Sequence, residues 1–194
     1  MAERVESSLE TDFEVRPMKP GDVDEFLDLL EIVAAEKRYI GAEAPIDREA
    51  KRQTYLDIID ADNWGSFVAT ERNRAIIGQI WLKDVRGLIE IGMLVAPQRR
   101  GRGIGSALLT AALHWARSRH AHKITLQLWP DNEAARKLYG KFGFVEEGHL
   151  RRQWKRRNGE IWDSIIMGLQ LQEEPRAAAI QENQSLPRRA PGQP

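Results

Sequence analysis

The residues with the clearest chemical meaning lie in the run VAPQRRGRGIGS, which covers residues 95–106. An apolar stretch precedes this run and an amphipathic one follows it, so we expect a strand, a turn and the start of a helix. Glycine has no side chain and tolerates positive φ, which lets backbone N–H groups converge at Gly101, Gly103 and Gly105. With the free N–H groups of a helix N-terminus they suit a phosphate or pyrophosphate, and mobile positive charge is added by Arg99, Arg100 and Arg102.

Two common phosphate-binding patterns do not fit this turn. A Walker loop ends in Gly-Lys-Ser or Gly-Lys-Thr, and the run contains no lysine. A dinucleotide-binding turn has the spacing Gly-x-Gly-x-x-Gly, whereas the spacing here is Gly-x-Gly-x-Gly. A plain strand-to-helix turn would also use glycine, but three alternating glycines among three arginines exceed that need. The run therefore indicates a phosphate site of another kind.

The same run resembles the cofactor segment of a known enzyme family. Gln98-x-x-Gly101-x-Gly103 is similar to the signature Gln/Arg-x-x-Gly-x-Gly/Ala of the GNAT superfamily of acyl-CoA N-acetyltransferases. A second block resembles that family's next segment at the right distance, and it reads Asn132-x-x-Ala135-x-x-Leu138-Tyr139-x-x-x-Gly143-Phe144. The resemblance covers about residues 12–170. It implies an N-acetyltransferase that moves the acetyl group of acetyl-CoA to a primary amine by direct attack in a ternary complex.

The resemblance also implies where the cofactor binds. The pantetheine arm is expected along Met93, Leu94 and Val95, and a backbone N–H near Leu94 would polarise the thioester carbonyl. The pyrophosphate is expected at the turn and the first helical residues, which are Arg100, Gly101, Arg102, Gly103, Ile104, Gly105 and Ser106. Asn132 resembles the family's pantetheine-contacting asparagine. Asparagine also serves as a plain helix N-cap, and the two roles are compatible.

Two residues are expected to move protons. Tyr139 resembles the family's general acid. A phenol suits this role, because it stays protonated at neutral pH and can donate to the departing thiolate. Its alternative role is packing on an apolar helical stripe. Glu90 lies in an apolar strand and resembles the base position of the histone-acetylating members; its alternative role is an outward-facing strand residue. Members that acetylate ribosomal-protein N-termini often carry glutamate at the position of Gln127, which cannot act as a base.

The sequence leaves the acceptor open between an amino acid, a polyamine, an antibiotic amine and a protein N-terminus. Candidate acceptor contacts are Tyr39, Glu43, Gln127 and Asp163. We expect a solvated hairpin, or a contact to the cofactor's 3′-phosphate or an acidic substrate, at the basic cluster Arg151, Arg152, Lys155, Arg156 and Arg157. The rival class to an enzyme is a non-catalytic acyl-CoA-binding or regulatory module on the same scaffold. Tyr139 favours catalysis, because a module that only binds needs no acid there.

A layered α/β (α+β) fold is needed to position these residues. Strands are expected at 13–16, 66–69, 75–81, 88–95, 124–129, 144–150 and 162–169. Helices are expected after Asp22, over 48–60, from Ile104 to about His120 and from Asn132 to Phe142, with Asp22 and Glu25 forming a capping box. The order βααβββαβαββ predicts a mixed, mostly antiparallel central sheet flanked by helices.

Composition and length limit the domain organisation, the partners and the location that we expect. The chain has 194 residues, 29 basic and 29 acidic side chains, and no cysteine. We expect a flexible N-terminus over 1–11, an N-acetyltransferase domain over 12–172 and a disordered tail over 173–194, which has little to bury. Balanced charge opposes binding to nucleic acid or an anionic membrane, and no apolar run suits a signal peptide or a membrane span. A cytoplasmic protein that needs no metal is expected, with a small-molecule or peptide amine as its partner; a homodimer is compatible with the sequence.

Overall fold

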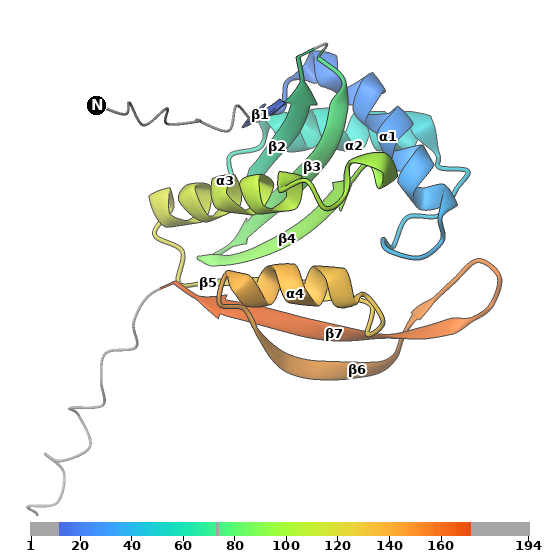
Figure 1. Cartoon of the computed structure of the whole chain (residues 1–194), viewed down its shortest axis with the longest axis vertical. Helices are drawn as coiled ribbons and strands as arrows, with labels where there is room; N and C mark the ends of the chain where they lie inside the picture. Colours follow the sequence, from blue (N-terminus) through green and yellow to red (C-terminus); the bar gives the residue numbers. More distant parts are fainter. Residues whose placement is uncertain (1–11, 73, 172–194) are drawn as a thin grey trace, which may run out of the picture.

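The strands of the computed structural model, which describes residues 12–72 and 74–171, form one sheet in the order β1-β2-β3-β4-β5-β7-β6 (Figure 1). They are β1 (Phe13–Pro17), β2 (Trp64–Glu71), β3 (Ile76–Val85), β4 (Leu88–Val95), β5 (Lys123–Leu128), β6 (Val145–Lys155) and β7 (Ile161–Gln170). The helices are α1 (Val23–Ala35), α2 (Arg48–Asp60), α3 (Ile104–Ser118) and α4 (Glu133–Lys141), with 3₁₀ turns η1 (Pro20–Asp22) and η2 (Pro97–Arg99). The expected order and the mixed, mostly antiparallel sheet are confirmed. The predicted N-terminal segment 1–11 and the tail 173–194 lie outside the described residues.

One pair of neighbouring strands differs from all the others. β4 and β5 are parallel, and only three residue pairs join them, Leu88–Lys123, Ile89–Ile124 and Glu90–Thr125. By contrast, β4 pairs with β3 along its whole length, and β5 pairs with β7 along its whole length. The second halves of β4 and β5 are therefore each paired on one side only, and the two strands separate there.

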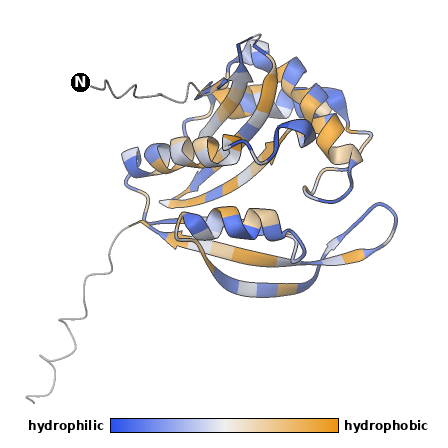
Figure 2. Cartoon of the chain, viewed as in Figure 1, coloured by the Kyte–Doolittle hydropathy of each residue, from blue (hydrophilic) through white to orange (hydrophobic). Residues whose placement is uncertain are grey.

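The helices cover both faces of the sheet. α1 and α2 lie on one face, in an apolar cluster that includes Phe26, Leu30, Val68 and Leu94. α3 and α4 lie on the other, in a cluster that includes Ile80, Leu108 and Tyr139. Figure 2 shows hydrophobic and hydrophilic residues mixed around α1 and α3, as expected for helices with one buried stripe. No described helix is long and apolar enough to cross a membrane.

The first turn of α3 meets Leu138 of α4 at Gly105, which carries no side chain. A Cβ atom at this position would lie 2.9 Å from Leu138 Cδ2 of α4, which is closer than real Cβ contacts. Gly78 of β3 similarly admits α3, since a Cβ there would lie 3.0 Å from Leu108 Cδ1. The turn before α3 and the inner side of α4 thus border one space.

The predicted capping box at the start of α1 is wrong. The carboxylate of Asp22 accepts hydrogen bonds from the Lys19 N–H and from the guanidinium of Arg16, both at 2.7 Å, and makes no cap bond to α1. Glu25 accepts from the N–H of Ile76 on β3. Asp22 is therefore taken by the preceding 3₁₀ turn and by β1, and Glu25 by β3, so neither carboxylate caps α1.

Two hairpins extend further than expected. β3 continues to Val85 and is joined to β4 by Arg86 and Gly87, whose φ angles are 58° and 85°. Positive φ at both central residues is typical of the tight hairpin turn whose twist matches the strands. β6 continues to Lys155, with an irregular register between Leu150 and Trp154. The longer β6–β7 hairpin reaches beyond the sheet towards the loop after α1 (Figure 1).

Candidate active site

A cleft of about 1090 Å³ opens where β4 and β5 separate. Its walls come from the loop between α1 and α2, from β3, β4 and β5, from the turn before α3 and from α4. The predicted residues that line it are Tyr39, Glu90, Met93, Leu94, Val95, Arg100, Gly101, Gly103, Ile104, Gly105, Ser106, Gln127, Asn132 and Tyr139. Three others, Arg102, Glu43 and Asp163, do not line it. The lining includes members of both apolar clusters, so the cleft passes through the sheet from one face to the other.

The turn before α3 has the conformation that its glycines predict. Gly101 and Gly103 have φ angles of 77° and 84°, in the left-handed region that favours glycine. A Cβ atom at either position would have nothing within 4 Å, so the space in front of the turn is open. Gly103 is the N-cap of α3 and offers no side-chain acceptor. The first N–H groups of α3 are therefore available to an anion, as at other helix N-termini.

The arginines of the turn are not all mobile, which corrects the expectation for two of them. Arg99 donates to both carboxylate oxygens of Glu71, at 2.6 and 3.2 Å. Arg100 donates to both carboxylate oxygens of Glu36. Among the described residues, Arg102 has neither an ion pair nor a side-chain hydrogen bond. Most of the positive potential at the turn therefore comes from backbone groups and Arg102, because the other two charges are neutralised.

Two lysines of α4, which the sequence pattern did not single out, supply further charge. Lys137 and Lys141 line the cleft from α4, and both side chains are exposed. Lys137 has only a distant carboxylate neighbour, Glu133, at 3.8 Å. Their four-residue spacing places them on one side of the helix, a signal that the sequence contains.

Tyr139 is buried on the inner side of α4, where it packs against Phe144 with ring centroids 5.5 Å apart. Burial raises the pKa of Tyr139 above its ordinary value, because the low-dielectric surroundings disfavour the charged phenolate. The phenol is therefore a proton donor throughout the neutral range. Asn132 caps α4, its side-chain oxygen accepting from the Ala135 N–H at 3.2 Å, and also lines the cleft.

The other half of the cleft is lined by polar and aromatic side chains of the sheet. Glu90 lies opposite Lys83 of β3 and Thr125 of β5, so the three share one face. Within the described chain, no side chain bonds to the exposed Glu90 carboxylate. Trp81 lies over Gly92, where a Cβ atom would be 2.5 Å from its ring. Glu90 is thus outward-facing with respect to the core, yet faces the cleft.

Gln127 and Asp163 have structural partners. The side-chain oxygen of Gln127 accepts from Ser164 Oγ at 3.2 Å and from Trp154 Nε1 at 3.4 Å. Asp163 accepts from the Arg152 N–H at 2.7 Å and contacts His149 Nε2 at 2.8 Å. These bonds, the backbone one first, lower the pKa of Asp163. Only Gln127 lies where an acceptor in the cleft could meet it.

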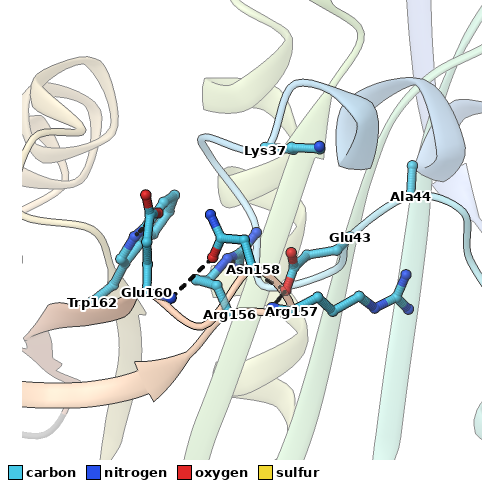
Figure 3. A pocket seen from close by; sticks show the side chains of 8 residues that line it. All are labelled: Lys37, Glu43, Ala44, Arg156, Arg157, Asn158, Glu160 and Trp162. Atoms are coloured by element: carbon cyan, nitrogen blue, oxygen red, sulfur yellow. Dashed lines mark hydrogen bonds and ion pairs between the residues drawn. The ribbon is translucent and has the colours of Figure 1, made fainter.

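The loop between α1 and α2 is fastened to the β6–β7 hairpin by a buried arginine. Arg156 is only 5% exposed, which corrects the expectation that the whole basic cluster is solvated. Its Nη1 donates to the carbonyls of Ile40 and Gly41, and its Nε lies 3.5 Å from Glu43 Oε1. A small pocket of about 210 Å³ lies at this contact, where Glu43 also accepts from the Arg157 N–H (Figure 3). Glu43 thus holds the loop rather than facing the cleft.

Aromatic rings surround the same guanidinium. Its carbon lies 4.6 Å from the ring centre of Trp162 and 5.7 Å from that of Trp129. Trp129 also packs edge-on against Trp154, and both of these rings line the cleft. The resemblance placed Trp154 and Trp162 in a hairpin near the acceptor, but sequence reasoning did not bring them together with Trp129 and Arg156, because these residues come from separate segments.

The sheet order, the split between two parallel strands and the glycine turn facing that split define an α+β fold with a cleft that has a helix N-terminus in its wall. A model of the acetyltransferase (GNAT) family matches residues 26–144. The chain belongs to this family. The resemblance noted from two sequence blocks is therefore confirmed.

Curated relatives match part of the chain. The chain is 33% identical over 88 residues to spermidine N(1)-acetyltransferase of Vibrio cholerae, which covers 43% of this chain and 51% of the relative. It is 29% identical over 154 residues to an uncharacterized N-acetyltransferase of Methanocaldococcus jannaschii, which covers 74% of this chain and 65% of the relative. The alignments thus span from about half to less than two thirds of these curated relatives.

A solved structure shows the same fold. The phosphinothricin acetyltransferase of Sinorhizobium meliloti, in complex with acetyl-CoA, superimposes with a TM-score of 0.74 and 17% identity. The match covers 89% of this chain and 97% of that one.

Proposed function

We propose that this protein transfers the acetyl group of acetyl-CoA to a primary amine, with both substrates bound together in the cleft. The observation that carries the proposal is the passage of the cleft through the sheet. It connects the glycine turn and the buried phenol of Tyr139 to the exposed carboxylate of Glu90. A non-catalytic acyl-CoA-binding module would use the turn but neither proton-moving group. An enzyme is therefore the better supported of the two classes.

The turn and the separated strands fit acetyl-CoA. The free N–H groups at the start of α3 suit the pyrophosphate, and Arg102, Lys137 and Lys141 can neutralise phosphate charge. The second half of β4, Met93–Val95, has no partner strand on the side of β5. Amide groups of the pantetheine arm can pair with such an edge as an added strand does. The acetyl-CoA complex of the Sinorhizobium meliloti protein, which shares this fold, supports the assignment.

The reaction requires two protons to leave the amine. A free alkylamine is mostly ammonium at neutral pH, so Glu90 takes one proton, directly or through water, before the nitrogen attacks. A nitrogen–carbon bond then forms at the thioester carbon, and a backbone N–H near Leu94 stabilises the oxyanion. The carbon–sulfur bond breaks, and Tyr139 donates its proton to the departing sulfur. The second amine proton leaves the nitrogen as the amide forms, and Tyr139 is reprotonated; the net products are the amide, coenzyme A and one proton.

The lining of the cleft favours an acceptor with one positive charge and an apolar or aromatic body. Glu90 is the single acidic residue among those that line the cleft. The lining also contains five basic residues, Lys51, Arg99, Arg100, Lys137 and Lys141, and several aromatic rings. A second ammonium group, as in a polyamine, would enter the cleft without a carboxylate partner, which is costly away from water.

The proposed activity is tested by measuring coenzyme A release from acetyl-CoA in the presence of single amines. Aliphatic and aromatic monoamines, amino acids, N-terminal peptides and polyamines form the panel. We expect monoamines with apolar bodies to give a kcat/KM at least ~10-fold above that of spermidine, a difference of about 1.4 kcal/mol. Release no faster than thioester hydrolysis with every amine would contradict the function. A preference for spermidine would contradict the acceptor class alone.

The cofactor site is tested by Gly103→Val. The φ angle of 84° strains any branched residue, and the new side chain would enter the open space in front of the turn. Affinity for acetyl-CoA, measured by calorimetry, should fall at least ~10-fold. Gly159→Val is the matched control, because Gly159 has a φ of 89° with equal open space but lies in the β6–β7 turn. Equal affinities in the two variants would place the phosphates elsewhere.

The role of Glu90 is tested by Glu90→Gln, which keeps the size of the side chain and removes its basicity. Turnover at neutral pH should fall by ~10²-fold or more. Part of the activity should return at higher pH, where the neutral amine is plentiful. Wild-type turnover of the variant at neutral pH would leave Glu90 as a solvent-facing strand residue.

The role of Tyr139 is tested by Tyr139→Phe. The ring remains packed against Phe144, so the melting temperature should change little. The turnover number should fall by ~10²–10⁴-fold, the range for losing a general acid. The dissociation constant of acetyl-CoA should stay nearly constant, because the hydroxyl acts when charge develops on sulfur. Lost affinity with unchanged turnover would instead make Tyr139 a cofactor-binding residue.

A further inference from the structure

Each of the three nitrogens of the Arg100 guanidinium donates to a partner outside the glycine turn. Its Nη1 and Nη2 donate to the two carboxylate oxygens of Glu36, the first at 2.9 Å. Its Nε donates to the Val95 carbonyl at 3.2 Å, and its carbon lies 4.6 Å from the ring centre of Tyr39. Glu36 directly follows α1, and Tyr39 lines the cleft. The Arg100 side chain therefore joins the turn before α3 to the wall of the cleft that the loop after α1 forms.

The geometry of this contact is specific to arginine. The two parallel bonds to one carboxylate use the planar fork of the guanidinium, and its flat face covers an aromatic ring. Glu36 and Arg100 are 27% and 34% exposed at their side chains, so the pair is partly shielded from water. A phosphate that took the two-pronged fork of Arg100 would have to displace Glu36, whereas Arg102 and the N–H groups of α3 are open to an anion without any such exchange.

The same wall is held at its other end by Arg156. That residue bonds to the carbonyls of Ile40 and Gly41, a few positions after Tyr39. The loop 36–47 is thus fixed from the β6–β7 hairpin and from the turn that precedes α3. Of these two attachments, only the one through Arg100 connects the acceptor wall to the proposed cofactor site.

We propose that Arg100 is a positioning residue for the acceptor rather than a phosphate ligand: through Glu36 and Tyr39 it sets the position of the loop 36–47 against the cleft. The identity of the two substrates rests on the proposed function, whereas the contact between Arg100 and Glu36 is independent of it. The proposal predicts that breaking the Arg100–Glu36 contact loosens the loop 36–47 and raises the KM for the amine acceptor, while acetyl-CoA still binds. If Arg100 were a phosphate ligand, freeing it from Glu36 would strengthen acetyl-CoA binding.

The test uses four variants of the full chain. Arg100→Gln, Glu36→Gln and the double variant of these two break the contact, and Arg102→Gln is the control. Amide hydrogen exchange of residues 36–47 is measured without ligand, and acetyl-CoA affinity by calorimetry. We expect exchange in the loop to accelerate at least ~10-fold in Arg100→Gln and Glu36→Gln, with no further acceleration in the double variant, as two members of one contact require. Arg102→Gln should leave the loop unchanged. Acetyl-CoA affinity should stay within ~3-fold in Arg100→Gln and Glu36→Gln, and the KM for the amine should rise ~10-fold.

Three results would overturn the proposal. They are unchanged exchange in the loop after Glu36→Gln, equal acceleration in Arg102→Gln, and tighter acetyl-CoA binding in Glu36→Gln together with weaker binding in Arg100→Gln. Failure of the proposed function has a different signature: the wild-type chain would not bind acetyl-CoA, while the exchange measurements would still report whether Arg100 holds the loop.

Discussion

The structure depends on the short pairing between β4 and β5. Three residue pairs hold the parallel strands together, after which each strand keeps only its antiparallel neighbour. Backbone N–H and C=O groups are obligatory hydrogen-bonding groups, so the inner edges of the separated halves require water or a ligand. A sheet edge has in effect been placed inside the molecule, where apolar walls from both clusters surround it. An extended ligand with amide groups could pair with such an edge in place of the missing strand.

The same split explains why the two proton-moving candidates lie on different faces. Tyr139 belongs to the cluster that α3 and α4 form on one face, and it is buried there. Glu90 shares the opposite face with Lys83 and Thr125. An intact sheet would separate them, whereas a cleft through the sheet lets both border one space. In the proposed mechanism the phenol of Tyr139 keeps its proton in an apolar setting, and the carboxylate of Glu90 is exposed to solvent.

Local signals were enough to predict much of this arrangement. The glycine spacing of the turn and the apolar stripe of α3 are properties of short segments, and both have the expected conformation. Long-range side-chain hydrogen bonds could not be predicted in this way. Arg100 and Glu36 are 64 positions apart, and Arg156 and Gly41 are 115 apart. From sequence alone, a run of arginines indicates a solvated surface. Local periodicity does not show which of them meet a carboxylate or a carbonyl from a distant segment in the folded chain.

Neutralisation of Arg99 and Arg100 also bears on how the turn can recognise an anion. Both guanidinium groups already bond to carboxylates, so their charge adds little at a distance. Apart from the charge of Arg102, the remaining attraction is short-ranged and directional, because it comes from N–H groups at the start of α3, which the left-handed glycines leave open to approach. Such a site distinguishes anions by shape and by depth of approach more than by total charge. A pyrophosphate that bridges several N–H groups satisfies it better than a single carboxylate, and this selectivity would be lost if mobile arginines dominated the turn.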